Sequence, residues 1–463
     1  MFNASTYIER RNKLKATLKT GILLFPGNDE SPMNYTDNTY HFRQDSSFLY
    51  FFGIDFPGLI GVIDIDNQKE YIFGNDYTID DIVWMGVQPT IKERCIKAGI
   101  ENSAPVIKGE EYLKDAAQKG RKIHYLPQYR GDNALKLHYW LGINPAEVND
   151  KSSLELVKAV VNQRNIKSVE EIEEINKASL LSADMHLAAI RFARPGMTEA
   201  NVMAEVYKTA LSANGNLAFP IIATKNGQTL HNHYYGNTIQ EGQLFLLDAG
   251  GEVESHYCGD LSSTFPVGRK FTDRQKEIYN VSLAAHEHAV SLLKPGVKFK
   301  EIHLSTCTLI AQSMKDLGFM KGNINDAVEQ GAHAMFFPCG LGHMMGLDVH
   351  DMENLGEVYV GYDGEAKSKL FGLKSLRLGR ELQPGFVFTI EPGIYFIPDL
   401  IDKWKGEKKF TEYLNYDKLE EYKNFGGCRN EEDFLITETG ARLLGKYLPK
   451  TVERIEEERE KAF

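Results

Sequence analysis

Cysteines are few in this sequence, and their spacing does not match a disulfide or zinc-binding pattern. The five of them are odd in number and widely scattered, without a CxxC pair: Cys95, Cys258, Cys307, Cys339 and Cys428. This pattern excludes a disulfide scaffold and a zinc ribbon. We expect all five to be reduced and structural, because a free cysteine behaves as a small buried hydrophobe.

Long apolar runs and an excess of positive charge are also missing. No apolar run approaches the roughly 20 residues that a membrane helix needs, and the first residues do not resemble a signal peptide. Lysine and arginine total 53 against 64 acidic residues, a net charge of -11, which argues against a nucleic-acid-binding protein. We therefore expect a cytoplasmic protein with a small-molecule or peptide partner, and with neither a nucleic-acid nor a membrane partner.

The chain is long enough for two domains, since it has 463 residues of which 42% are hydrophobic. Between about residues 20 and 160, short apolar runs alternate with polar helical stretches, as in an α/β domain. Ser168 followed by Glu171 is a capping-box pattern that opens a helix, and a second one occurs at Thr272 and Gln275. We expect a new domain to begin near Ser168.

The C-terminal half contains β-rich segments bounded by glycine or proline, at residues 243–248, 254–267, 386–396 and 433–437. Residues 397–426 are rich in lysine and acidic residues, which indicates a surface excursion. The tail, residues 451–463, is expected to be a charged helix with a solvated face.

Carboxylate and imidazole side chains lie in or beside these segments. Four acids around one cavity would repel one another and lose solvation unless cations neutralised them, and two divalent ions supply the four positive charges needed. Any one acid alone is more often a turn or cap residue, so the combination is what predicts a hydrolytic two-metal site. The candidate ligands are Asp248, Asp260, His343, Glu391 and Glu431.

Six motifs containing these residues follow one another in the chain. They are Leu247-Asp248-Ala249-Gly250, Gly259-Asp260-Leu261-Ser262-Ser263-Thr264-Phe265-Pro266, Gly340-Leu341-Gly342-His343, Gly346-Leu347-Asp348-Val349-His350-Asp351, Thr389-Ile390-Glu391-Pro392-Gly393-Ile394-Tyr395 and Arg429-Asn430-Glu431-Glu432-Asp433. In this order they resemble the pita-bread metallopeptidases, in particular the branch containing aminopeptidase P and prolidase. Residues 42–46 and 83–86 resemble that branch's N-terminal domain, so the resemblance spans nearly the whole chain.

The resemblance implies an α/β creatinase-like N-terminal domain over residues 1–165. It implies an α+β pita-bread catalytic domain over residues 166–463, with a curved, mainly antiparallel sheet.

Metal roles carry over position by position. Asp260 and Glu431 would bridge two ions, Asp248 would bind one of them, and His343 and Glu391 would bind the other. Oxygen-rich ligation with one imidazole suits Mn²⁺, although Co²⁺ or Zn²⁺ also binds such a site. Asn430 departs from the family, which usually has an apolar residue there, and the adjacent Glu432 leaves open a register shifted by one.

Catalytic and substrate-binding roles are also implied. Glu391 would manage a proton, and His350 would stabilise the developing oxyanion. His231 would lie beside the substrate, with His233 as a competing choice. Arg429 is carried over as a substrate-binding residue. The remaining histidines, including His286, His288, His303 and His333, are expected to be structural.

The implied substrate is an N-terminal Xaa-Pro bond, whose tertiary amide lacks the N–H that general peptidases recognise. Residues 374–380 resemble a prolidase insertion in which an arginine captures the free carboxylate of a dipeptide, a role that falls to Arg377. This favours an Xaa-Pro dipeptidase over an aminopeptidase P acting on longer peptides. More remote alternatives are a metal-free pita-bread binding module and creatinase-like carbon–nitrogen hydrolysis, and the intact ligand set disfavours both.

Trp84 lies in the N-terminal domain, in a segment that the family uses to border the active site of a partner subunit. This implies that Trp84 contacts substrate and that the protein is a homodimer. The alternative is a tryptophan buried in its own domain core.

Overall fold

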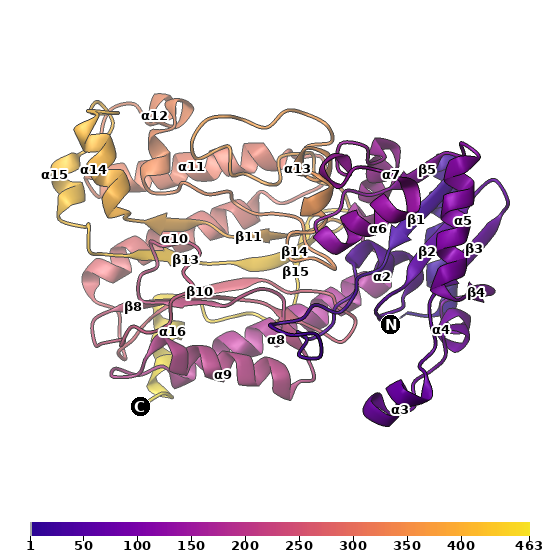
Figure 1. The fold of residues 1–463 in the computed structure, drawn as a ribbon. Coiled ribbons are helices and arrows are strands. Elements are labelled where there is room, and N and C mark those ends of the chain that lie inside the picture. The colour runs from indigo at the N-terminus through magenta and orange to yellow at the C-terminus, as the bar shows by residue number, and fades with distance from the viewer. Residues whose placement is uncertain (1) are drawn as a thin grey trace. The chain divides into compact units, whose positions relative to one another are not determined.

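In the computed structural model, which describes residues 2–463, the chain divides into two units (Figure 1). The first comprises residues 2–164 and Met352–Tyr359. The second comprises Asn165–Asp351 and Val360–Phe463. Within the described residues, no helix is both long enough and apolar enough to span a membrane.

Helices and short strands alternate in the first unit. Its elements are α1 (Ala4–Leu18), β1 (Ile22–Pro26), α2 (Ser46–Phe52), β2 (Ile60–Asp64), β3 (Lys69–Phe73), α3 (Ile79–Met85), α4 (Ile91–Lys97), β4 (Asn102–Ala104), α5 (Val106–Gln118), β5 (Ile123–Tyr125), α6 (Gly131–Leu141), the 3₁₀ turn η1 (Pro145–Glu147), α7 (Leu154–Asn165) and η3 (Glu353–Leu355).

A five-stranded sheet in the order β4-β3-β2-β1-β5 forms the centre of this unit. β1 pairs antiparallel with β2 and parallel with β5. All five residues of β1 are buried, as expected for an inner strand covered on both faces. Leu24 and Val62 from the sheet pack with Leu113 of α5 and Leu137 of α6. The mixed sheet and its helices confirm the predicted α/β fold.

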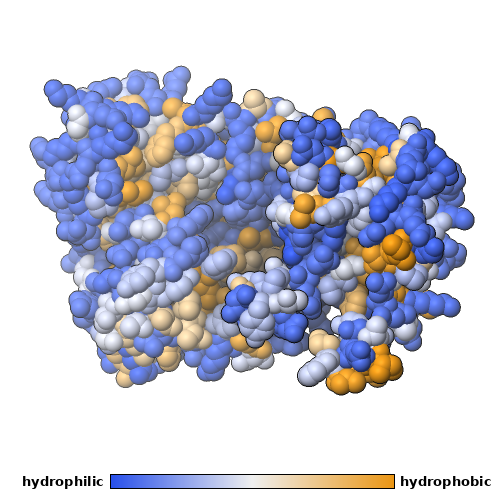
Figure 2. All heavy atoms as spheres, in the orientation of Figure 1, coloured by the Kyte–Doolittle hydropathy of each residue, from blue (hydrophilic) through white to orange (hydrophobic). Residues whose placement is uncertain are grey.

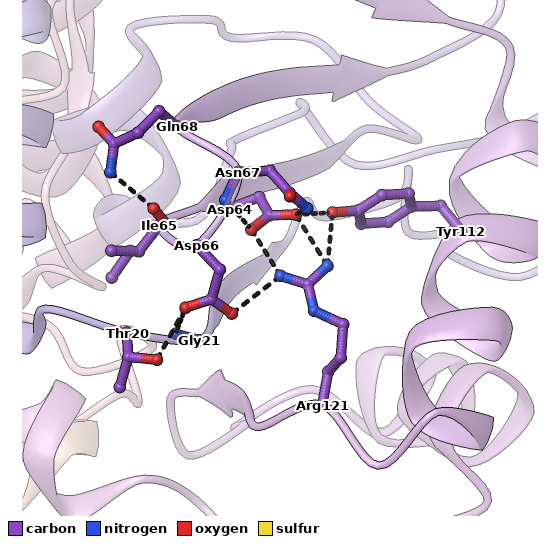
Figure 3. A network of polar contacts seen from close by, with 9 residues as sticks. All are labelled: Thr20, Gly21, Asp64, Ile65, Asp66, Asn67, Gln68, Tyr112 and Arg121. Atoms are coloured by element: carbon purple, nitrogen blue, oxygen red, sulfur yellow. Dashed lines mark hydrogen bonds and ion pairs between the residues drawn. The ribbon is translucent and has the colours of Figure 1, made fainter.

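A polar network fixes the turn between β2 and β3 (Figure 3). Asp64 is buried and accepts hydrogen bonds from Arg121, at 2.6 and 2.8 Å, and from Tyr112. Arg121 also pairs with Asp66, at 3.0 Å. Burial opposes ionisation of Asp64, but the hydrogen bonds from Arg121, Tyr112 and Asn67 outweigh it and hold the pKa of Asp64 below its usual range.

α3 presents an exposed apolar surface (Figure 2). None of its residues is buried, and Trp84 is 85% exposed. The interpretation of Trp84 as a buried core residue is therefore wrong. Its apolar neighbours on α3 and just beyond it are also exposed: Ile79, Val83, Met85 and Val87.

The second unit contains longer helices and several small sheets. Its elements are α8 (Val169–Phe192), α9 (Glu199–Ser212), β6 (Asn216–Leu217), β7 (Ile222–Thr224), β8 (Leu244–Ala249), β9 (Gly251–Glu252), β10 (Leu261–Pro266), α10 (Asp273–Ser291), α11 (Phe299–Asp316), α12 (Ile324–Gln330), η2 (Ala332–Met335), β11 (Val387–Ile390), β12 (Gly393–Tyr395), α14 (Pro398–Gly406), α15 (Tyr416–Glu420), β13 (Gly427–Arg429), β14 (Glu432–Ile436), β15 (Ala441–Leu443) and α16 (Val452–Glu460), while α13 (Glu357–Val360) crosses the division.

The strands of the second unit form sheets in the orders β10-β8-β7, β11-β14-β15, β12-β13 and β6-β9, and every described pairing is antiparallel. α8 packs against β8 and β10, and α10 packs against β12 and β13 (Figure 1). Both predicted capping boxes are confirmed, at Ser168 before α8 and at Thr272 before α10. The mainly antiparallel α+β prediction is thus confirmed.

The C-terminal helix α16 corrects one expectation. Val452, Ile455 and Arg459 of this helix are buried, so the tail is more than a solvated face. The guanidinium of Arg459 donates to the carbonyl oxygens of Ile190, Ala193, Val267 and Gly268. The charged composition concealed this docking, because a buried arginine whose guanidinium donates to four backbone carbonyls looks the same in the sequence as a solvated one.

Candidate active site

β8 and β10 bring the first two acids together. The strands pair antiparallel with Asp248 opposite Ser262, and Asp260 immediately precedes β10. The connection returns tightly, because a Cβ on Gly250 would lie 2.0 Å from the carbonyl oxygen of Gly259. Only glycine permits that approach. The spacing of Asp248 and Asp260 in the sequence therefore correctly indicated that two neighbouring antiparallel strands bring them together.

His343 and Glu391 are placed by the pairing of two segments far apart in the chain. The Thr389 amide donates to the His343 carbonyl at 3.0 Å, and the Glu391 amide donates to the Leu341 carbonyl at 2.8 Å. Between these two bonds, a Cβ on Gly342 would lie 2.0 Å from the Thr389 carbonyl oxygen. The glycine in Gly-His is thus required for His343 to approach Glu391.

Glu431 joins the site through a bridge to β10. Its amide donates to the Ser262 carbonyl at 3.1 Å, and the Ser262 hydroxyl donates to its Oε2 at 2.6 Å. Glu432 instead pairs with Lys450. Asn430 is buried, and its Nδ2 donates to Ser282 of α10 at 3.1 Å. Glu431, and not Glu432, therefore faces the other acids.

The five candidate ligands converge. One ligand atom from each of Asp260, His343 and Glu431 lies within 4.8 Å of the others. The Nε2 of His343 is 3.3 Å from Asp260 Oδ2 and 3.8 Å from Glu391 Oε1. Asp248 is close enough for its charge to raise the pKa values of Asp260, Glu391 and Glu431.

Burial and mutual repulsion make this cluster hard to ionise fully. Burial raises the pKa of Asp260 well above its usual range, and the charges of Asp248, Asp433 and Glu391 add to the effect. Burial likewise raises the pKa values of Glu391 and Glu431, while Arg429 opposes the rise in both. One guanidinium does not balance four carboxylates.

The residues present fit divalent metal ions. Among residues 2–463, the buried Oδ1 of Asp260 has no hydrogen-bond partner, as expected of an oxygen reserved for a cation. Carboxylates with one imidazole suit hard-to-borderline ions. The Nδ1 of His343 lies 3.1 Å from the Met344 carbonyl, which orients its Nε2 toward the acids.

The buried side chain of Arg429 donates hydrogen bonds to residues in and beside this cluster. Its Nε donates to Ser262 Oγ and its Nη1 to Tyr395 Oη, both at 2.8 Å, and its Nη2 donates to Asp248 at 2.5 Å. Arg429 is buried, and these contacts describe a residue that positions Asp248. Substrate binding by Arg429 remains a prediction without a described contact to support it.

Three supporting residues were not identified from the sequence: Ser262, Tyr395 and Asp433. The buried Asp433 accepts from Ser179 Oγ at 2.5 Å and from the Asp260 amide at 3.2 Å, and burial raises its pKa to about 7. Strand alternation offered a signal for two of them. Ser262 and Asp433 each lie two positions after a candidate ligand, on the same face of the chain.

The predicted catalytic histidines and Arg377 lie around the cluster. The ring centroids of His350 and His343 are 4.1 Å apart. Burial lowers the pKa of His231; the charge of Asp248 opposes this shift, and those of Arg429, His350 and Arg377 add to it. The charge of Arg377 also lowers the pKa of Glu391. His231, His350 and Arg377 thus share the electrostatic environment of the site.

Comparison with known proteins gives relatives over the full length. The chain is 31% identical to the Xaa-Pro dipeptidase of Homo sapiens, over 98% of this chain and 92% of that protein. It is 26% identical to a probable Xaa-Pro aminopeptidase of Aspergillus niger, over 97% of this chain and 95% of that protein.

Solved structures agree with this relationship. The fold matches an Escherichia coli aminopeptidase P variant in complex with substrate, with a TM-score of 0.82 and 26% identity over 100% of this chain and 99% of that one. A zinc-substituted Escherichia coli aminopeptidase P in complex with product matches equally well, at TM-score 0.82.

Family models match both parts of the chain. Residues 7–124 match the aminopeptidase P N-terminal domain. Residues 173–438, which contain all five candidate ligands, match metallopeptidase family M24. With these matches and the convergent acids, the chain belongs to metallopeptidase family M24.

Proposed function

We propose that this protein hydrolyses the N-terminal Xaa-Pro peptide bond with two divalent metal ions, and that Xaa-Pro dipeptides are its preferred substrates. The observation that carries the proposal is the convergence of Asp260, His343 and Glu431 within a family M24 fold. Glu391 lies 3.8 Å from His343, and the charge of Asp248 acts on the other acids. The full-length relatives named Xaa-Pro dipeptidase and Xaa-Pro aminopeptidase support the substrate class. The intact set of ligand-type side chains speaks against a metal-free binding module.

Asp260 and Glu431 would bridge the two ions, Asp248 would hold one of them, and His343 and Glu391 would hold the other. The chemistry that such a pair supplies is polarisation of a carbonyl and acidification of water. Mn²⁺ is our proposal for the resident metal, with Co²⁺ or Zn²⁺ as alternatives, because the donors are mostly oxygen.

The chain's own groups then handle charge and protons. Glu391 is half-buried at the edge of the cluster, and we assign it to hold the proton taken from water. His350 and His231 would donate hydrogen bonds to the oxygen on which negative charge develops. The pKa of His231 is lowered, mainly by burial, so its imidazole would act as a neutral donor near pH 7.

Arg377 carries the preference for dipeptides. Its positive charge acts on His231, His343 and Glu391, which is where the carboxylate of a bound dipeptide would need a partner. The alternative is an aminopeptidase P that cleaves longer peptides, and the similarity to aminopeptidase P structures favours it.

A matched pair of substrates tests the proposal. Manganese-loaded protein is assayed on an Xaa-Pro dipeptide and on the same sequence extended by one or two residues. Cleavage of the dipeptide alone is the expected result. Preference for the extended peptide would indicate aminopeptidase P. Cleavage of neither, with metal bound, would overturn the Xaa-Pro assignment.

We also propose a cytoplasmic homodimer, with an N-terminal domain over residues 1–165 and a catalytic domain over residues 166–463. The exposed apolar surface of α3 supports the dimer, since an exposed cluster of large apolar side chains commonly marks an interface. Trp84 at its centre would border the partner's substrate site. Trp84→Ala should weaken the dimer in sedimentation, and a monomeric wild-type protein would contradict this arrangement.

A further inference from the structure

A second group of metal-ligand side chains lies in the catalytic unit, and none of its members belongs to the five-residue site. His303 and Cys307 are one helical turn apart on α11, and His333 lies in η2. One ligand atom from each lies within 4.8 Å of the others. All three side chains are fully buried, each with 0% exposure.

Hydrogen bonding leaves these histidines unsatisfied. Within the described chain, the buried Nδ1 of His303 has no hydrogen-bond partner, and neither ring nitrogen of His333 has one in good geometry, although the Val328 carbonyl lies beside His333. Buried polar atoms in native proteins nearly always have a partner, and each exception needs an explanation. Two poorly paired histidines whose ligand atoms also lie within 4.8 Å of a thiol favour a bound ion over core packing alone.

The geometry suits a tetrahedral ion. The Sγ of Cys307 is 3.5 Å from Nε2 of His303. Typical zinc–sulfur and zinc–nitrogen distances, at a tetrahedral angle, separate the two ligand atoms by about 3.5 Å. A weak S–H···N hydrogen bond would account for this pair as well, but it leaves His333 unexplained.

Neutral imidazole and thiolate are the forms that bind a metal ion. An ion that enters this cluster therefore displaces one proton, from Cys307.

We propose that His303, Cys307 and His333 bind one divalent ion of the zinc class, separate from the ions of the five-residue site. Thiolate and imidazole ligands select Zn²⁺, whereas the carboxylate-rich site suits Mn²⁺. The bound ion cross-links α11 to η2, and η2 leads through Cys339 into the segment that carries His343. The three side chains fill three of the four positions of a tetrahedral zinc ion. Because all three have 0% exposure, the role proposed for the ion is to cross-link the core.

Cobalt provides a probe that reports on thiolate ligation alone. Protein is produced in cobalt-supplemented medium, and its near-ultraviolet absorption is recorded. A thiolate bound to Co²⁺ gives an intense charge-transfer band, and the carboxylate and imidazole ligands of the five-residue site do not. We expect the band in wild-type protein, its loss in Cys307→Ser and His333→Ala, and its retention in Cys95→Ser, which removes a buried thiol from the other unit.

Two results would overturn the proposal: absence of the band in cobalt-loaded wild-type protein, or a band that survives Cys307→Ser. If the variants fail to fold, wild-type crystals decide the question. Data collected at the zinc absorption edge should show an anomalous peak among the three side chains, and its absence in zinc-grown protein would reject the site. Neither measurement uses peptidase activity, so the outcome is independent of the proposed function.

Discussion

Arg429 holds Asp248 at an Nη2–Oδ2 distance of 2.5 Å, and the same guanidinium donates to Ser262 and Tyr395. Arg429 thus fixes the orientation of one candidate metal ligand. It also links that ligand to Ser262, whose hydroxyl donates a hydrogen bond to Glu431, a second candidate ligand. The electrostatic balance and the geometry of the site depend on the same side chain.

Arg429→Ala is expected to lower the affinity for Mn²⁺ about 10–100-fold, because Asp248 loses the donor that orients it. Isothermal titration of metal-free protein measures this affinity. Arg429→Lys keeps the charge without the forked geometry and should lose less. An affinity that rises in Arg429→Ala would mean that the charge of Arg429, and not its orienting contact, dominates.

His231→Ala should reduce kcat about 10²–10³-fold, as expected for loss of one donor to a developing oxyanion, with the metal content unchanged. His233→Ala is the matched control, two residues further along the same loop, and should retain nearly full activity. Equal losses in the two variants, or loss of metal from His231→Ala, would contradict the role assigned to His231.

Arg377→Ala should raise KM for an Xaa-Pro dipeptide about 10–100-fold, the value of one lost charge-assisted hydrogen bond, and should raise KM much less for longer peptides. Arg380→Ala serves as a control, because Arg380 contacts the Val360 carbonyl and Asp363 instead. Equal effects of Arg377→Ala on the two substrates would remove the proposed capture of the carboxylate.

Lys167 and Asp351 form a buried ion pair at 2.8 Å, and both side chains are 1% exposed. Asp351 directly follows His350 in the chain. Lys167→Met leaves a carboxylate buried without this partner and should cost about 3–5 kcal/mol of unfolding free energy. It should also lower kcat, because the loop carrying His350 loses its anchor. Lys177→Met, which breaks an exposed pair with Glu174, should cost under about 1 kcal/mol, and similar losses in both would contradict this reasoning.

The Asp64–Arg121 pair predicts a pH-dependent stability. The pKa of Asp64 is lowered in the folded state, so its contribution is present above the unfolded pKa of about 3.9 and is lost as the pH falls toward the folded value. Arg121→Met should therefore destabilise the first unit by about 3 kcal/mol at pH 7 and by much less near pH 2.

Urea denaturation at several pH values measures the difference between wild type and Arg121→Met. Lys122→Met is the control for this series, since it breaks an exposed pair with Glu155 and should change stability little at any pH. A gap between wild type and Arg121→Met that stays constant down to pH 2 would contradict the titration of Asp64.

The sequence by itself determined the two-part α/β and α+β organisation and both capping boxes. It also determined the identity of the acids that converge. Local hydrogen bonds and side-chain alternation follow from neighbours in the chain. The caps at Ser168 and Thr272, and the placement of Asp248 and Asp260 at two neighbouring antiparallel strands, were therefore predictable.

Only the tertiary structure decided which groups support the acids. Arg429, Tyr395 and Ser179 reach the site through contacts between residues far apart in the chain, which no local periodicity predicts. The exposure of Trp84, the burial of Arg459 and the meeting of His333 with Cys307 were settled in the same way. The physical reason is that burial and polar partnership belong to the packed chain as a whole, and each is fixed only when distant segments come together.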